Sequence, residues 1–369
     1  GIGANQSFEQ SVSIYVDGVH YGKSRQVRTG LFDLQQVEVL RGPQGILFGK
    51  NTLAGAINVT SASPTVGDEF EGKVSLSKES HGSEIVEVSM SGSLSDTFAV
   101  RLAFKDRKDD GYMTNSLVAG ATFVGEPLPG AFSPNMPISD ESMWRLSALW
   151  EPNDSTSVEF KHAKSDHTRT GGTAVLGTFS PLANIPGSNA LMYGTMGAVY
   201  PGFAGQVAAG AVDSFRDAVT PGGCDLAAKM GRSHEVCANG GEMPEATDTT
   251  TDDTSLNIEI DMANGYTFTS VTGLNKYEYE DGIDADFLPL RFIGRSDISS
   301  YEHTSQEFRI ASPSENKFSY VAGAYYDEQE QIIDRLVAVD GTFGIPGTMP
   351  YILGAPVLDT FLFFPPATT

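Results

Sequence analysis

Several features that define other protein classes are scarce in this sequence of 369 residues. Only 19% of the residues are charged, and 24 lysines and arginines stand against 47 aspartates and glutamates, which gives a net charge of -23. Because duplex binding rests on cationic contacts to phosphate, this balance excludes a nucleic-acid partner. No run of about 18 apolar residues occurs, so the sequence predicts no helix that spans a bilayer.

Cysteine is also rare, since Cys224 and Cys237 are the only two and lie in a polar, glycine-rich stretch. In an exported protein a disulfide between them would close a short loop and stabilise it by ~3 kcal/mol. Two free or buried thiols are an alternative. A metal site that includes His234 is a third interpretation, but two sulfurs and one imidazole at this spacing do not match a zinc ligand set. The sequence predicts no cofactor.

Glycine, by contrast, is concentrated in RGPQGILFGKNTLAGAIN at residues 41–58, which has the composition of a phosphate-binding loop. That loop requires a glycine five positions before Gly49 and a hydroxyl after Lys50, where this sequence has Gln44 and Asn51. The stretch therefore predicts no nucleotide site. An enzyme is disfavoured as well, because no motif groups a base, a nucleophile and an oxyanion donor.

From about residue 70 the sequence alternates apolar and polar positions, as strands with one apolar and one hydrophilic face do. In FAVRLAFK, for example, Leu102 and Phe104 face one way and Arg101 faces the other. The seventh strand changes phase after Phe268, with Val271 on the other face, which predicts a bulge or a different register. Nine strands are predicted, at residues 70–79, 84–94, 97–107, 142–151, 155–165, 251–262, 265–279, 301–312 and 316–330.

The connections between these strands alternate in length. The tight turns SDT, PND, ANG and PSEN lie at one end of the sheet, whereas the other end carries, after a first short hairpin, connections of about 34, 85 and 21 residues. Short turns at one end and long loops at the other are typical of outer-membrane β-barrels; a soluble sandwich is the alternative. Since bacterial barrels have even strand numbers, nine strands indicate a missed strand or a chain that stops within the barrel.

Residues 14–64 contain IYVDGVHYGKS and then LFDLQQVEVLRGPQGILFGKNTLAGAINVTSASP, an ordered pattern that closely resembles the second half of the plug domain of TonB-dependent outer-membrane receptors. SQEFRIASP and FSYVAGAYYDEQE resemble barrel hairpins of the same family. The resemblance implies an all-β membrane fold, in which an antiparallel transmembrane barrel of about 22 strands, about nine of them present here, surrounds an internal α+β plug. It implies the C-terminal part of the plug at residues 1–66 and the N-terminal part of the barrel at residues 67–369. No signal peptide is visible, and the sequence is expected to begin downstream of the true start.

Within the plug pattern the resemblance implies a folding and contact motif. Positions that need positive φ or a close backbone approach fall to Gly42, Gly45, Gly49 and Gly55. In the family, plug arginines pair with carboxylates of the barrel wall. Arg41 stands in the matching motif, and Glu38 is a further candidate for the same network. The predicted motif comprises Glu38, Arg41, Gly42, Pro43, Gly45, Gly49, Asn51, Gly55 and Asn58.

The loop VHYGKSRQVR at residues 19–28 lies where the plug apex of the family faces the extracellular vestibule. His20, Tyr21, Lys23 and Arg25 could hydrogen-bond an oxygen-rich or anionic cargo, and Tyr21 could stack on an aromatic one. A solvated loop with ordinary polar residues is the alternative. The two cations favour an anionic cargo such as a ferric chelate.

The implied function is active import of a scarce, bulky nutrient across the bacterial outer membrane, foremost a ferric siderophore or similar iron chelate. The implied partners are TonB with its inner-membrane energising complex, a small-molecule cargo, and outer-membrane lipid and lipopolysaccharide. A surface receptor or signalling protein of the same architecture is one alternative, and an importer of cobalamin or glycan is another. The loop at 166–250, which holds the cysteine pair, is the largest candidate for cargo specificity.

Overall fold

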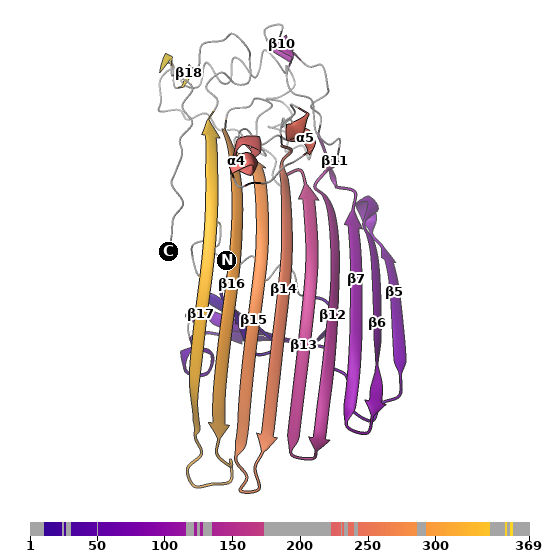
Figure 1. Cartoon of the computed structure of the whole chain (residues 1–369), viewed down its shortest axis with the longest axis vertical. Coiled ribbons are helices and arrows are strands. Elements are labelled where there is room, and N and C mark those ends of the chain that lie inside the picture. The colour runs from indigo at the N-terminus through magenta and orange to yellow at the C-terminus, as the bar shows by residue number, and fades with distance from the viewer. Residues whose placement is uncertain are drawn as a thin grey trace.

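The computed structural model describes residues 11–23, 26, 31–49, 51–115, 122–123, 126–127, 135–172, 223–229, 231, 235–239, 243–285, 293–339, 351–352 and 355–356. Two sheets organise these residues: a four-stranded sheet near the N-terminus and a nine-stranded antiparallel sheet that forms a curved wall (Figure 1). No helix in these ranges is long and apolar enough to cross a membrane.

The wall is a continuous antiparallel meander, in which each strand pairs with its neighbours in the chain. All nine predicted strands are confirmed. From β12 onward they extend further at the long-loop end than the alternation indicated. The strands are β5 (Glu71–Lys78), β6 (Glu84–Ser95), β7 (Phe98–Asp109), β12 (Ile138–Asn153), β13 (Thr156–Thr170), β14 (Ala246–Asp261), β15 (Thr267–Asp284), β16 (Ile293–Ala311) and β17 (Val321–Val339).

Strand alternation gives the wall two different faces. Large apolar side chains such as Leu102, Leu146 and Phe308 are exposed on the outer face. The predicted bulge after Phe268 is wrong, because β15 pairs with β14 and β16 without a register shift. Val271 lies on the inner face because it packs in the apolar core of the four-stranded sheet.

The four-stranded sheet lies within the residues for which the resemblance implies a plug, and we call it the plug. It consists of β1 (Val12–Val16), β2 (Val19–Tyr21), β3 (Leu34–Arg41) and β4 (Gly55–Ser61) in the order β2-β1-β4-β3, and the short helix α1 (Gly45–Phe48) precedes β4. β1 and β4 are parallel and the other pairs are antiparallel. Val16, Val19, Tyr21 and Val59 form its core together with Val271 of the wall. The expected boundary at residues 66 and 67 falls between β4 and β5.

The predicted disulfide between Cys224 and Cys237 is confirmed, with a Cα–Cα distance of 5.6 Å. It joins α4 (Gly223–Lys229) to α5 (Glu235–Ala238), and Leu226 of α4 packs against Ile298 and Leu336. Ile298 is an even number of residues from the outward Phe308, so this contact lies on the outer face. In Figure 1, α4 accordingly lies in front of the wall and the plug lies behind it. Helix α4 of the predicted cargo loop therefore packs on the outer face of the wall.

The remaining elements are short and lie at the ends of the wall strands or in the connections. They are η2 (Ser80–Gly82), β8 (Met113–Thr114), β9 (Thr122–Phe123), β10 (Glu126–Pro127), β11 (Asn135–Met136), β18 (Tyr351–Ile352) and β19 (Ala355–Pro356).

Candidate functional site

A buried ion pair joins the plug to the wall at Asp17. Asp17 and Gly18 form the two-residue turn between β1 and β2, and both have positive φ, 52° and 84°, as the preferred hairpin turns require. The Asp17 carboxylate accepts hydrogen bonds from Lys161 Nζ of β13 at 2.9 Å, from the Ser61 amide at 2.9 Å and from Ser61 Oγ at 2.8 Å. Lys161 Nζ also donates to the Ser61 carbonyl oxygen at 3.1 Å. The Asp17 and Lys161 side chains are only 7% and 4% exposed.

A second acidic residue of the plug, Asp33, makes a bidentate contact with the wall. Arg101 of β7 donates to its carboxylate through Nε at 2.8 Å and through Nη2 at 2.5 Å. Arg145 of β12 donates to the Phe32 carbonyl oxygen at 2.8 Å, and its guanidinium lies 4.6 Å from the centre of the Phe32 ring. The Ala62 amide donates to the Asp33 carbonyl oxygen at 2.8 Å.

The wall cations of these contacts lie at one height on three adjacent strands. Ser147 pairs in register with Arg101 on one side and with Lys161 on the other, and Arg145 is two residues away on the same face. We call Asp17, Asp33, Ser61, Arg101, Arg145 and Lys161 the plug–wall cluster. Removing one partner of a buried ion pair costs ~3–5 kcal/mol, because a charge then remains buried without compensation. The cluster can therefore hold the plug firmly through contacts that break reversibly.

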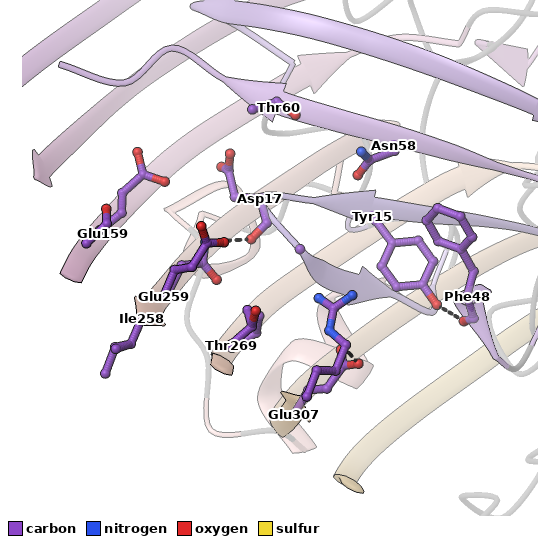
Figure 2. A pocket seen from close by; sticks show the side chains of 15 residues that line it. Tyr15, Asp17, Phe48, Asn58, Thr60, Glu159, Ile258, Glu259, Thr269 and Glu307 are labelled. Carbon is purple, nitrogen blue, oxygen red and sulfur yellow. Dashed lines mark hydrogen bonds and ion pairs between the residues drawn. The ribbon is translucent and has the colours of Figure 1, made fainter. Parts of the chain in front are cut away.

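A cavity of about 600 Å³ lies beside the plug–wall cluster, between the plug and strands β13 to β16. Figure 2 shows Glu159, Glu259 and Glu307 of the wall around this space, with Asp17 and Tyr15 on the plug side. Burial, and then the negative charges of Glu307 and Asp327, raise the pKa of Tyr15 to about 12. Tyr15 therefore stays protonated at neutral pH, and its hydroxyl donates to the Phe48 carbonyl oxygen.

The predicted cargo-binding residues at the plug apex are largely enclosed. His20 and Tyr21 are 3% and 4% exposed, so in this structure neither offers a free surface to a ligand. Burial, and then the charges of Asp253 and Asp17, raise the pKa of Tyr21. Lys23 is half-buried and its amide donates to Gln26 Oε1 at 2.9 Å. Arg25 lies outside the described residues. Cargo binding by this group stays a prediction.

The two charged residues of the predicted motif lie on β3, at the edge of the plug sheet, and both are exposed. Glu38 accepts a hydrogen bond from Asn58 Nδ2 at 2.8 Å. None of the ion pairs between described residues includes Arg41, so its pairing with the wall stays a prediction.

The glycines of the predicted motif have two separate roles. Gly42, just before Pro43, and Gly49 have φ of 83° and 71°, and Asn51 also has positive φ, at 66°. A Cβ on Gly55, whose φ is 155°, would lie 2.4 Å from the Leu40 carbonyl oxygen, so this position requires glycine. The same expectation is wrong for Gly45, which begins α1 without positive φ; the atom nearest to a Cβ there would be Thr52 Oγ1, at 4.0 Å.

Sequence reasoning placed Arg101 on the hydrophilic face of the wall but missed the partners that the cluster's cations have on the plug. Asp17 had a usable signal, since Asp-Gly between two apolar runs is a strong indicator of a hairpin. Asp33 and Ser61 carried no comparable signal. The described residues contain no group of three or more His, Cys, Asp or Glu side chains that could hold a metal ion.

Comparison with known proteins shows what the plug and the fold are similar to. The family described as the TonB-dependent Receptor Plug Domain matches residues 1–56. The pesticin receptor of Yersinia pestis is 36% identical over 119 residues, which cover 31% of this chain and 17% of that receptor. The vitamin B12 transporter BtuB of Vibrio vulnificus is 26% identical over 109 residues, which cover 28% of this chain and 18% of the transporter.

Two solved structures share the fold over nearly the whole chain. The ferric yersiniabactin uptake receptor FyuA of Yersinia pestis has a TM-score of 0.61 at 19% identity, covering 91% of this chain and 42% of that one. The ferripyoverdine receptor of the Pseudomonas aeruginosa outer membrane has a TM-score of 0.55 at 13% identity, covering 98% and 41%. The chain thus spans less than half the length of these structures. Residues 1–56 thus match the plug domain family of TonB-dependent receptors, and the described part of the chain shares the fold of the two outer-membrane receptors.

Proposed function

We propose that this protein imports a bulky nutrient across the outer membrane by TonB-driven displacement of its plug, and that no covalent bond of the cargo is made or broken. The observation that carries the proposal is the plug–wall cluster, in which buried but non-covalent contacts attach the plug to the wall. A transporter of this kind has to stay closed at rest and open under force. Ion pairs that are excluded from water satisfy both requirements, because they are strong when intact and separate without chemistry.

The chain order of the plug supports a mechanical role for Asp17. Among the described residues β1 is the first strand, and it runs directly into the Asp17-Gly18 turn. A pull by TonB on the chain before β1 would load this strand, and the load would reach Lys161 through the Asp17 carboxylate. Ser61, at the end of the parallel strand β4, shares the same hydrogen bonds. A pull along β1 therefore acts on the contact between plug and wall.

The foremost cargo candidate is a ferric siderophore or similar iron chelate. Two relatives of the same fold are receptors for ferric yersiniabactin and ferripyoverdine. Cobalamin is a second candidate, because 109 residues of the chain also match a vitamin B12 transporter. The exposed apolar outer face of the wall fits the proposed contact with outer-membrane lipid and lipopolysaccharide.

The abundance of the protein in outer membranes from cells grown with and without available iron tests the cargo. A sharp rise under iron starvation is expected for a receptor of iron chelates. Unchanged abundance would contradict an iron cargo and would direct uptake assays to cobalamin and glycans.

A further inference from the structure

We propose that His303 of β16 is a buried, doubly protonated histidine that positions the plug strand β2 on the wall, and that this contact weakens in alkaline solution. The assignment does not depend on the proposed import function, and its test uses neither cargo nor TonB. The residues that connect β2 to four wall strands form one hydrogen-bonded chain, which we call the β2 network: Tyr21, Asp253, Asn275, His303, Asp327 and Gln329.

The β2 network follows one cross-strand row of the wall. Asp253 of β14 pairs in register with Asn275 of β15. Asn275 pairs in turn with His303 of β16, and His303 pairs with Gln329 of β17. Side chains directly opposite each other on one face of a sheet are close enough to interact. Asn275 and His303 are only 5% and 2% exposed, so this part of the row is shielded from bulk water.

Strand β2 of the plug packs directly on this part of the wall. A Cβ on Gly273 of β15 would lie 2.4 Å from Val19 Cγ1, so any larger residue at this position would collide with β2. Two residues after Val19, the Tyr21 hydroxyl donates a hydrogen bond to the Asp253 carboxylate. The position of β2 therefore depends on where the wall holds Asp253.

The hydrogen bonds of Asn275 show which atoms donate. Its Nδ2 donates to Asp253 Oδ1 at 2.8 Å, as expected because an ionised carboxylate can only accept. The other atom of the same amide, Oδ1, lies 3.2 Å from His303 Nδ1. An amide oxygen is also only an acceptor. His303 Nδ1 must therefore carry a proton.

The second ring nitrogen of His303 faces an acceptor as well. Its Nε2 lies 2.6 Å from Asp327 Oδ1, and Gln329 Nε2 donates to both oxygens of the Asp327 carboxylate at 3.1 Å. A neutral ring would place one nitrogen lone pair against an oxygen lone pair, at a side chain that is 0% exposed and cannot turn to water. Both ring nitrogens therefore donate, and His303 is a cation paired with Asp327.

The charges around His303 favour its cationic form. The charged and titratable residues on the elements packed around it are Asp327, Asp253, Tyr301, Tyr277, Tyr21 and Arg145. Tyrosines are uncharged at neutral pH, so two carboxylates stand against the single cation Arg145. His20 precedes Tyr21 on β2 and is retained in every variant of the labelling test below.

Loss of a proton from His303 would break one of its two hydrogen bonds. An ordinary histidine in water loses this proton near pH ~6.5. Above that pH the packed state of β2 holds one proton more than the released state, so release becomes easier as pH rises, by up to about tenfold per pH unit. Below pH ~6.5 both states hold the proton, and the contact keeps its full strength.

Nitrogen NMR of the complete protein, purified from outer membranes and isotope-labelled at histidine, tests the protonation state. At a pH of about 7.5, one unit above the ordinary titration of histidine, the His303 ring should show two protonated nitrogens. The signal that is absent from His303→Gln identifies this ring. If that variant does not assemble, Asp327→Asn identifies it instead, because loss of the carboxylate charge should shift the signal toward a neutral ring. A neutral His303 in the unaltered protein would overturn the proposal and place the proton on Asp253.

Labelling of a cysteine at position 19 tests the link to β2. Val19 is 3% exposed, so Val19→Cys should react with maleimide only when β2 leaves the wall. The reference is the same cysteine in a protein that also carries His303→Gln and Asp327→Asn, which removes the titrating pair. The ratio of the two rates cancels the titration of the thiol and of His20. Above pH ~6.5 this ratio should rise by up to about tenfold per pH unit, and below it the ratio should stay constant.

The matched control is His162→Gln, the same substitution at a histidine on the outer face. His162 Nδ1 lies 3.7 Å from Asp252, and the two side chains are 27% and 49% exposed. This variant should keep the pH profile of the Val19→Cys protein. A ratio that does not change with pH, or an equal loss of pH dependence in His162→Gln, would overturn the positioning role of His303 even if its ring is doubly protonated.

Discussion

Replacing Lys161 by methionine should loosen the plug from the wall by a large and measurable amount. Asp17 and Lys161 are 7% and 4% exposed, so the substitution leaves a buried carboxylate without its counter-charge. Such a loss costs ~3–5 kcal/mol, and we expect the lower end because Asp17 keeps two hydrogen bonds from Ser61. At about 1.4 kcal/mol per factor of ten, the population of the displaced plug should rise about a hundredfold.

Cysteine labelling can measure this change, because both native cysteines are bonded to each other. Val59 lies in the plug core and is 2% exposed, so a cysteine placed there should react with maleimide only when the plug opens. The labelling rate should rise about a hundredfold in Lys161→Met, and less in the Lys161→Met, Asp17→Asn double variant, in which the buried charge of Asp17 is removed as well.

The matched control is Lys276→Met, the same substitution in an exposed ion pair. Lys276 Nζ lies 3.4 Å from Glu302, with the two side chains 48% and 63% exposed. Because exposed pairs contribute little, the labelling rate should stay at the level of the unaltered protein. A change of less than about twofold in Lys161→Met, or an equal change in the control, would refute the assigned role of the Asp17–Lys161 pair.

Three further predictions test the membrane face, the plug backbone and the disulfide. Leu146→Arg should cost ~2–4 kcal/mol at mid-bilayer and reduce the heat-stable outer-membrane species on gels, whereas full assembly would show that Leu146 does not face lipid. Gly55→Ala should prevent plug closure, because its Cβ would lie 2.4 Å from a carbonyl oxygen. Gly42→Ala should destabilise the plug less, because its Cβ would meet no atom within 4 Å. Equal protease sensitivity of the two variants would contradict this order. Cys224→Ser should lower the stability of the α4 segment by ~3 kcal/mol and speed its proteolysis, while cargo binding persists. Loss of cargo binding would instead place this segment in the cargo site.

The strands of the wall could be predicted because each has an apolar outer face and a polar inner face. This arrangement makes apolar and polar residues alternate along the sequence. The prediction weakened where that arrangement ends. Beyond the bilayer both faces of β14 become polar, in TDTTTDDT at residues 247–254, and the predicted strand began too late. Val271 departs from the alternation for a different reason. It is an apolar residue on the inner face because it packs against the plug, and the sequence of one strand gives no sign of that contact.

The contacts between plug and wall were largely beyond prediction from sequence. Asp17 and Lys161 are 144 residues apart, and neither has a neighbour in the chain that marks it as paired. The family motif directed attention to Arg41, whereas the contacts found here reverse the expected polarity, with acids on the plug and bases on the wall. His20 and Tyr21 were identified as loop residues, but both belong to the buried strand β2, which packs against Val271 of the wall.

The most direct test of the account is uptake of radiolabelled iron chelates by cells that express this protein in the presence and in the absence of TonB. A panel of anionic, neutral and cationic chelates, with cobalamin alongside, covers the proposed cargo classes. Uptake that requires both this protein and TonB is the predicted result. Uptake that persists without TonB, or binding at the cell surface with no uptake of any compound, would contradict TonB-dependent import.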